Sequence, residues 1–266
     1  MKIIFWSPYY GLGSTTSSLA AIASYMSLTA RQDCCIISTN YKEKIQSYFI
    51  AKNNVGNLMD SATSFGTDAL WRDAKSSMLS NDSVRNAAIE LTSRLSIFIS
   101  SSLNNPKLIT KTWIDCCDSV FTALDKRYNF VFVDTSAGNS LLNQRVLSQA
   151  DLIVVCLNQS VLKCDDVFNG NRFKFDGQNC AFLIGNYDPD MIFSLKALRS
   201  KYKAVNSKNS MTIRHCTDFA NAVNKGNVLK WIASVQSNPR SSANPFVKEV
   251  EEASAKLLKL LNISLK

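Results

Sequence analysis

The chain has 266 residues, of which 46% are hydrophobic, 10% aromatic and 19% charged. This composition excludes an intrinsically disordered protein and suits one large α/β domain or two small ones. No apolar run reaches the ~18 residues that a membrane-spanning helix requires. The short apolar start leads directly into a glycine loop, without the cleavage site of a signal peptide. We therefore expect one domain over residues 1–266, in a cytoplasmic protein.

The eight cysteines form no C-x-x-C pair, and the chain has one histidine, His215. These spacings exclude the usual zinc sites and disulfide frameworks. Most of the cysteines lie within apolar runs. We interpret them as small hydrophobic core residues of a protein in a reducing compartment.

Apolar runs predict strands, in chain order, at residues 2–6, 34–38, 95–100, 130–133, 152–157, 181–184 and 211–213. Helices are expected at residues 15–28, over most of 60–90, and at 108–126, 140–149, 190–202 and 246–261. Short, all-apolar strands that alternate with helices are typical of a parallel sheet covered on both faces. The expected fold class is therefore α/β, a doubly wound, mostly parallel sheet that binds its ligands at the carboxyl ends of the strands.

The loop after the first strand reads SPYYGLGSTTSS, and it has the context of a phosphate site: strand, glycine loop, helix. Gly11 and Gly13 let the backbone turn its N–H groups inward, and the helix from Thr15 offers its positive end to an anion. Against the P-loop pattern G-x-x-x-x-G-K-[ST], Pro8 stands for the first glycine and Ser14 for the lysine. Thr15 keeps the hydroxyl that holds Mg²⁺. A glycine turn that merely leads into a helix is the alternative that this pattern leaves open.

The loop and helix resemble those of the deviant Walker ATPases, the group that includes ParA, MinD, Soj and the nitrogenase iron protein. The match is GLGSTTSSLAAIA, residues 11–23, against GGVGKTTTSANLA. Further similar segments are FVFVDTSAG (130–138), ADLIVVCLNQS (150–160), FLIGNYDPD (182–190) and RHCTDFANAVNKGNV (214–228). The resemblance spans nearly the whole chain and implies a P-loop NTPase-like fold.

The resemblance also implies a site for ATP and Mg²⁺. By this match Asp134 and Thr15 hold Mg²⁺, and Asn186 contacts the adenine. The switch positions fall on Asn40 and Gly138. The implied nucleotide-binding loop residues are Gly11, Leu12, Gly13, Ser14, Thr15 and Thr16. From the residues alone, Asp134 followed by a threonine is also consistent with a plain helix cap.

Both lysines of the family's loop are missing, because a second, signature lysine falls on Tyr9 and the P-loop lysine on Ser14. A P-loop lysine stabilises charge on the transferred phosphate, and serine carries no charge. Loss of a preorganised donor costs roughly 10²–10³ in rate. The family's aspartates after the second strand match Ser38 and Asn40, neither of which is a competent base. We therefore expect weak ATP binding or binding without efficient hydrolysis; active turnover and no physiological nucleotide are the alternatives.

Two further segments suggest partners. Residues 191–217 hold six lysines or arginines and no acid, including the candidate anionic-partner patch Lys196, Arg199, Lys201 and Lys203. The segment predicts either a solvated basic face or a surface for DNA or membrane. The basic, leucine-rich helical segment at residues 256–265 predicts either a core helix or an amphipathic membrane anchor such as MinD-like proteins carry at this end.

The leading hypothesis is a degenerate ParA/MinD-class positioning or assembly factor that dimerises. It is closest to the TadZ/CpaE-type proteins, and its partner would belong to a pilus, secretion, conjugation or partition apparatus. The first alternative is a partition-type protein that binds DNA nonspecifically. The second is a slow ATPase that a partner completes in trans. The expected location is the cytoplasm, peripheral to the membrane or the nucleoid.

Overall fold

The computed structural model describes the chain except for residues 31, 52–64, 171–172, 174–177, 238–243 and 264–266. Across the described part, eight strands form one sheet in the order β3-β4-β2-β5-β1-β6-β7-β8. Every neighbouring pair is parallel except β3 and β4. The strands are β1 (Lys2–Trp6), β2 (Cys34–Ser38), β3 (Ile89–Thr92), β4 (Leu95–Ile97), β5 (Phe130–Asp134), β6 (Leu152–Leu157), β7 (Cys180–Tyr187) and β8 (Ser210–Arg214).

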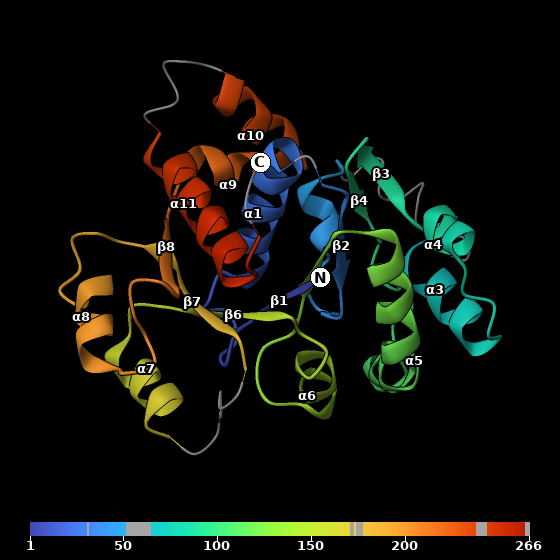
Figure 1. The fold of residues 1–266 in the computed structure, drawn as a ribbon, viewed down its shortest axis with the longest axis horizontal. Coiled ribbons are helices and arrows are strands. Elements are labelled where there is room, and N and C mark those ends of the chain that lie inside the picture. The colour runs from blue at the N-terminus through green and yellow to red at the C-terminus, as the bar shows by residue number, and fades with distance from the viewer. Residues whose placement is uncertain (31, 52–64, 171–172, 174–177, 238–243, 264–266) are drawn as a thin grey trace.

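Helices cover both faces of this sheet (Figure 1). One face carries α1 (Thr15–Thr29), the 3₁₀ helix η1 (Ile45–Tyr48), α9 (Thr217–Asn224), α10 (Val228–Ser237) and α11 (Pro245–Leu260). The other face carries α3 (Gly66–Lys75), α4 (Asn81–Ala87), α5 (Pro106–Arg127), α6 (Leu141–Leu147), α7 (Val161–Phe168) and α8 (Leu195–Lys201). The predicted doubly wound α/β fold is confirmed.

The central strand β1 is apolar at residues 3–6, and its two faces show why. Ile3 and Phe5 lie in the core under α1, whereas Ile4 and Trp6 lie in the cores on the opposite face. Because neighbouring side chains of a strand point to opposite faces, a strand covered on both sides needs apolar residues at every position. Six of the eight cysteines are likewise buried and two are half-buried, all as free thiols, in agreement with their interpretation as core residues.

Helices α9 and α10 were not predicted, and β4 ends at Ile97 rather than at residue 100. Two larger differences concern segments that were expected to be helical. The segment 60–90 was expected to be mostly helical to its end, but α4 stops at Ala87 and Ile89 begins β3, an edge strand antiparallel to β4. The helix expected over 190–202 begins only at Leu195. The Asp188 carboxylate accepts a hydrogen bond from the Asp190 N–H, and such a local turn competes with the helix until Ser194 caps it.

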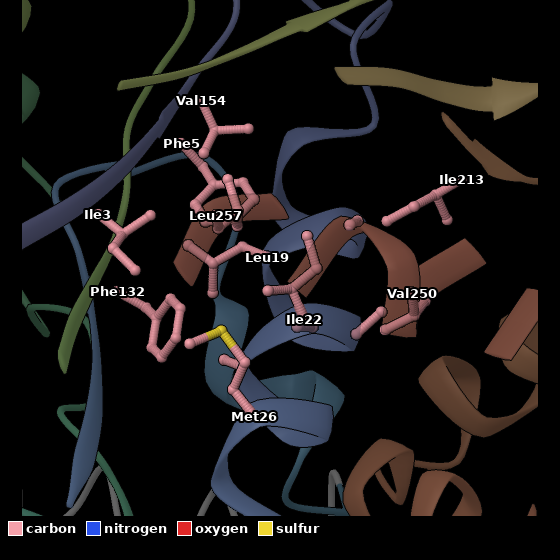
Figure 2. Close-up of a cluster of buried hydrophobic side chains, with 14 of the residues drawn as sticks. Ile3, Phe5, Leu19, Ile22, Met26, Phe132, Val154, Ile213, Val250 and Leu257 are labelled. Carbon is pink, nitrogen blue, oxygen red and sulfur yellow. The ribbon is translucent and has the colours of Figure 1, made fainter. Parts of the chain in front are cut away.

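The C-terminal helix α11 is a core helix. Val250 and Leu257 are fully buried in the cluster that contains α1 and the sheet residues Phe5 and Phe132 (Figure 2). The membrane-anchor alternative is therefore not supported, since the apolar face of α11 is already occupied. In the part of the chain that the structure describes, no helix is long and apolar enough to cross a membrane.

Leu257→Ala is expected to lower the free energy of unfolding by about 2–5 kcal/mol, because it leaves a cavity between α11 and α1. Lys259→Ala, at an exposed position of the same helix, is expected to change it by less than about 0.5 kcal/mol. Urea denaturation of both variants measures the difference. Equal effects would show that α11 does not pack as described.

Candidate functional site

The loop between β1 and α1 fits closely against the carboxyl ends of β6 and β7. A Cβ added to Gly13 would lie 2.7 Å from the Cys156 carbonyl oxygen, and one added to Gly185 would lie 2.7 Å from the Gly13 carbonyl oxygen. Gly11 and Ser14 both take positive φ angles, 67° and 49°. The two glycines at the contact thus let the loop backbone, rather than side chains, line the edge of the sheet.

A first cavity of about 390 Å³ lies over this loop. Five of the six predicted loop residues line it, and so do residues from the loops after β2 and β5. The lining residues are Tyr9, Tyr10, Gly11, Gly13, Ser14, Thr15, Thr16, Ser17, Asn40, Lys42, Glu43, Thr135 and Ala137. Leu12, the sixth, lies at the surface with 39% of its area exposed.

A second cavity of about 250 Å³ shares Ser14 and Ser17 with the first. Asn186, at the end of β7, lines it, as do residues of the segment 214–228, which resembles a family segment near the base pocket. The lining residues are Ser14, Ser17, Ser18, Asn186, Ile213, Arg214, His215, Cys216, Phe219, Ala220, Val223, Asn224 and Phe246. The two cavities therefore adjoin at Ser14 and Ser17, one over the glycine loop and the other at the predicted adenine position.

Asp134 is fully buried at the end of β5. Its carboxylate accepts hydrogen bonds from the hydroxyls of Thr16, at 3.0 Å, and Ser38, at 3.1 Å. Burial raises its pKa from 3.8 to about 7, and the nearby charge of Glu43 raises it too, while the two hydroxyls lower it. The structure thus joins Asp134 to Thr16, whereas Thr15, the predicted partner at a metal site, lines the first cavity.

The helix-cap alternative for Asp134 is wrong. Helix α6 begins seven residues later, at Leu141, and its cap is Ser140, whose hydroxyl accepts from the Asn143 N–H. The Thr135 hydroxyl instead donates to the Phe5 carbonyl. A buried carboxylate that does not cap a helix is a group whose negative charge a bound cation would compensate.

The two predicted switch positions are both held by local hydrogen bonds. The Asn40 side-chain oxygen accepts from the backbone N–H groups of Lys42 and Glu43. Gly138 takes a φ of 89°, and its carbonyl accepts from the Trp6 indole at 2.8 Å and from the Asn143 amide at 2.7 Å. Asn40 lines the first cavity, whereas Gly138 does not, although Thr135 and Ala137 of the same loop do.

The sequence analysis missed two charged residues of the site, Lys42 and Glu43, because it considered only the positions that match the family's aspartates. Glu43 lies 3.3 Å from the Thr16 hydroxyl and also accepts from Tyr48. The Lys42 ammonium lies 4.1 Å from the centre of the Tyr10 ring. Their position directly after a strand that ends at the binding edge was the available signal.

The residues around Asp134 fit Mg²⁺ bound together with phosphates. Magnesium in nucleotide sites is held by one or two carboxylates, hydroxyls, waters and phosphate oxygens. Asp134, Thr16 and Glu43 offer such oxygens at one place, and Thr15 lines the adjoining cavity. Within the described residues there is no cluster of three His, Cys, Asp or Glu that would hold a metal ion by itself. Phosphate ligands would therefore be required to complete the site.

Tyr9, at the signature-lysine position, is fixed by neighbours on α7. Its hydroxyl donates to Asp166, and the Lys163 ammonium lies 4.4 Å from its ring centre. The adjacent Asp165 pairs with Lys201 at 2.8 Å. The two aspartates therefore both have partners within the structure.

Two of the four residues of the candidate basic patch already bind other residues of the chain. The Arg199 guanidinium donates to the hydroxyl and the carbonyl of Ser210, and Lys201 pairs with Asp165. Lys196 and Lys203 lie exposed at the surface. Binding of DNA through this region stays a prediction.

No protein-family model matches the sequence, and no curated protein matches it. Among solved structures, the chain is similar to a ParA family ATPase from Chlorobium tepidum TLS, with a TM-score of 0.73 and 12% identity over 96% of this chain and 98% of that one. It is also similar to the cell division ATPase MinD of Pyrococcus furiosus, with a TM-score of 0.69 and 13% identity over 97% and 98%. A plasmid partition protein from Borrelia burgdorferi B31, bound to AMPPNP, gives a TM-score of 0.64 and 16% identity over 97% and 98%. At these identities the likeness shows the fold, which is that of the ParA and MinD ATPases.

The buried Asp134 carboxyl group predicts a pH dependence of stability. Its pKa is higher in the folded than in the unfolded chain, so the folded chain binds more protons between pH 3.8 and about 7. The free energy of unfolding then falls as pH rises through this window, and a change of this size corresponds to on the order of 4 kcal/mol.

Asp134→Asn, which stays neutral, is expected to remove this part of the pH dependence. Urea denaturation of both proteins in EDTA, at about pH 5 and about pH 8, measures it. Added MgATP is expected to restore wild-type stability at the higher pH, because a bound cation compensates the charge. Identical pH dependence in the two proteins would contradict the account of this group.

Proposed function

We propose that the chain binds ATP with Mg²⁺ at the carboxyl edge of the sheet and acts as a ParA/MinD-like positioning or assembly factor rather than as an efficient ATPase. The observation that carries this proposal is the pair of cavities that meet at Ser14 and Ser17. A nucleotide needs one end that binds phosphates and another that binds a base, and the two cavities differ in this way. The AMPPNP bound by the similar partition protein supports the same occupant.

The first cavity suits phosphates because its loop presents backbone. Gly11 and Gly13 expose the main chain, and the first turn of α1 has no side-chain cap. The free N–H groups of such a turn, together with the helix dipole, attract an anion. These groups do not depend on a lysine, so binding survives where its usual cation is absent.

The second cavity suits a base. Phe219 and Phe246 line it with ring centres 4.7 Å apart, and Ile213 adds apolar surface. Asn186, held at a φ of 48° at the end of β7, supplies an amide that both donates and accepts. A mostly apolar pocket with one such polar group is typical of base recognition.

Hydrolysis lacks its usual groups at three positions. Ser14 and Tyr9 bring no charge to the phosphates, and Asn40 is an amide whose oxygen is already bound by its own loop. A site that binds ATP but does not stabilise the charge of the phosphoryl-transfer transition state is occupied by the nucleotide and hydrolyses it slowly. A partner that supplies the missing charge in trans would convert the chain into a slow ATPase, which is the alternative function.

The binding edge also carries exposed apolar side chains, which supports a homodimer. Leu141, Leu162 and Ile192 follow β5, β6 and β7 and are 74%, 82% and 99% exposed. The Gln159 amide donates to the carbonyls of Asp188 and Phe193 and so joins the start of α7, which carries Leu162, to the loop that bears Ile192. Clustered exposed apolar residues mark an interaction surface. A dimer closed over this edge would enclose the nucleotide, and the assembled pair would engage a partner in a pilus, secretion, conjugation or partition apparatus.

Ser14→Glu is expected to weaken ATP binding by more than about tenfold, because a carboxylate would face the phosphates. Ser207→Glu is the matched control. Ser207 is exposed and precedes β8, at the amino-terminal ends of the strands, so this variant is expected to bind ATP as the wild type does. Isothermal titration calorimetry with MgATP compares them. If the two variants bind ATP equally, the phosphates do not lie over the loop.

Ile192→Glu is expected to reduce ATP-dependent dimerisation, since it places a charge on an apolar interface. Met78→Glu, a 70% exposed position between α3 and α4, serves as control. Light scattering after gel filtration, with and without MgATP, gives the mass. A dimer that persists in Ile192→Glu would show that another surface joins the subunits.

A further inference from the structure

The phosphate cavity contains one cation that the family pattern did not predict. Among the described residues that line it, Lys42 is the single lysine or arginine, and it comes from the loop after β2 rather than from the glycine loop. The charge that Ser14 and Tyr9 do not supply is therefore present at the same cavity, on a different segment of the chain.

The backbone of Lys42 is held in place. Its N–H donates to the Asn40 side-chain oxygen at 3.1 Å, and the Asn40 N–H donates to the Ser38 hydroxyl at 3.0 Å. The Ser38 hydroxyl in turn donates to Asp134. The loop that carries Lys42 is thereby connected to the candidate Mg²⁺ position by a continuous chain of hydrogen bonds.

The side chain of Lys42 lies over the glycine loop. Its ammonium is 4.1 Å from the ring centre of Tyr10 and 5.9 Å from that of Tyr41. In the described structure it forms no ion pair, and the neighbouring Glu43 is engaged by Thr16 and Tyr48. Attraction of an exposed ammonium to an aromatic face is weak compared with its attraction to phosphate oxygens. The Lys42 side chain thus lines the cavity and can turn toward a bound anion.

We propose that Lys42 contacts the terminal phosphates of ATP bound in the first cavity and replaces, from the loop after β2, the charge of the missing P-loop lysine. This inference rests on the proposed function, because it assumes ATP in that cavity. Since Lys42 and Asn40 belong to one hydrogen-bonded loop, contact with the phosphates also couples the loop after β2 to the presence of the terminal phosphate.

The test compares binding of MgATP and of adenosine to the wild type and to three variants: Lys42→Gln, Lys42→Arg and the neighbouring Lys44→Gln. Lys42→Gln is expected to lower ATP affinity about tenfold or more, the size typical of a lost hydrogen bond to a charged group. It is expected to leave adenosine affinity unchanged. Lys42→Arg is expected to keep ATP affinity, because it keeps the charge. Lys44→Gln removes an equal charge beside the cavity, not in its lining, and is expected to bind ATP as the wild type does.

Three outcomes would overturn the inference. If Lys42→Gln binds ATP as tightly as the wild type, the phosphates do not meet Lys42, although the proposed function stands. If Lys44→Gln loses as much ATP affinity as Lys42→Gln, the loss reflects the lower net positive charge near the site and not a contact of Lys42 with the phosphates. If the wild type itself binds no ATP, the proposed function fails and this inference fails with it. Lys42 and Lys44 are both exposed, so thermal unfolding of each variant is expected to match the wild type.

Discussion

The close approach of the glycine loop to the end of β7 is the contact on which the rest of the site depends. Gly185 and Gly13 have no side chains, so the loop backbone lies directly against the sheet, and Ser14 takes its left-handed conformation there. This contact sets the floor of both cavities and leaves Ser14 and Ser17 as their shared border. A larger side chain at either glycine would lift the loop and separate the two cavities.

The charges of the site are unusual for one that receives an anion. The loop brings no cation, while two carboxylates, Asp134 and Glu43, lie on either side of the Thr16 hydroxyl. Without a cation these carboxylates would repel a triphosphate, and burial already disfavours the charge on Asp134. Mg²⁺ and Lys42 together would balance this charge. Retention of a buried carboxylate and an uncapped helix therefore argues for binding, and the missing lysines argue against rapid turnover.

The sequence predicted the fold because the strands at the centre of the sheet are apolar over most of their length, a pattern that a doubly covered sheet requires. It predicted the loop residues and Asn186 through their resemblance to known motifs, and all of these residues except Leu12 line the two cavities. It did not predict β3, whose alternating residues form a half-buried edge, nor the late start of α8, which depends on the Asp188 turn. Lys42 and Glu43 were missed because their place at the site depends on the conformation of the loop after β2. A comparison of motif positions gives no information on that conformation.

The most direct test of the account is isothermal titration calorimetry of the wild-type chain with ATP, with and without Mg²⁺. The account predicts saturable binding that Mg²⁺ strengthens and that Asp134→Ala weakens, together with little release of phosphate over the course of the titration. No heat of binding at a millimolar concentration of ATP would contradict it. In that case the two cavities would be remnants of the fold, and the function would lie on the protein's partner surfaces.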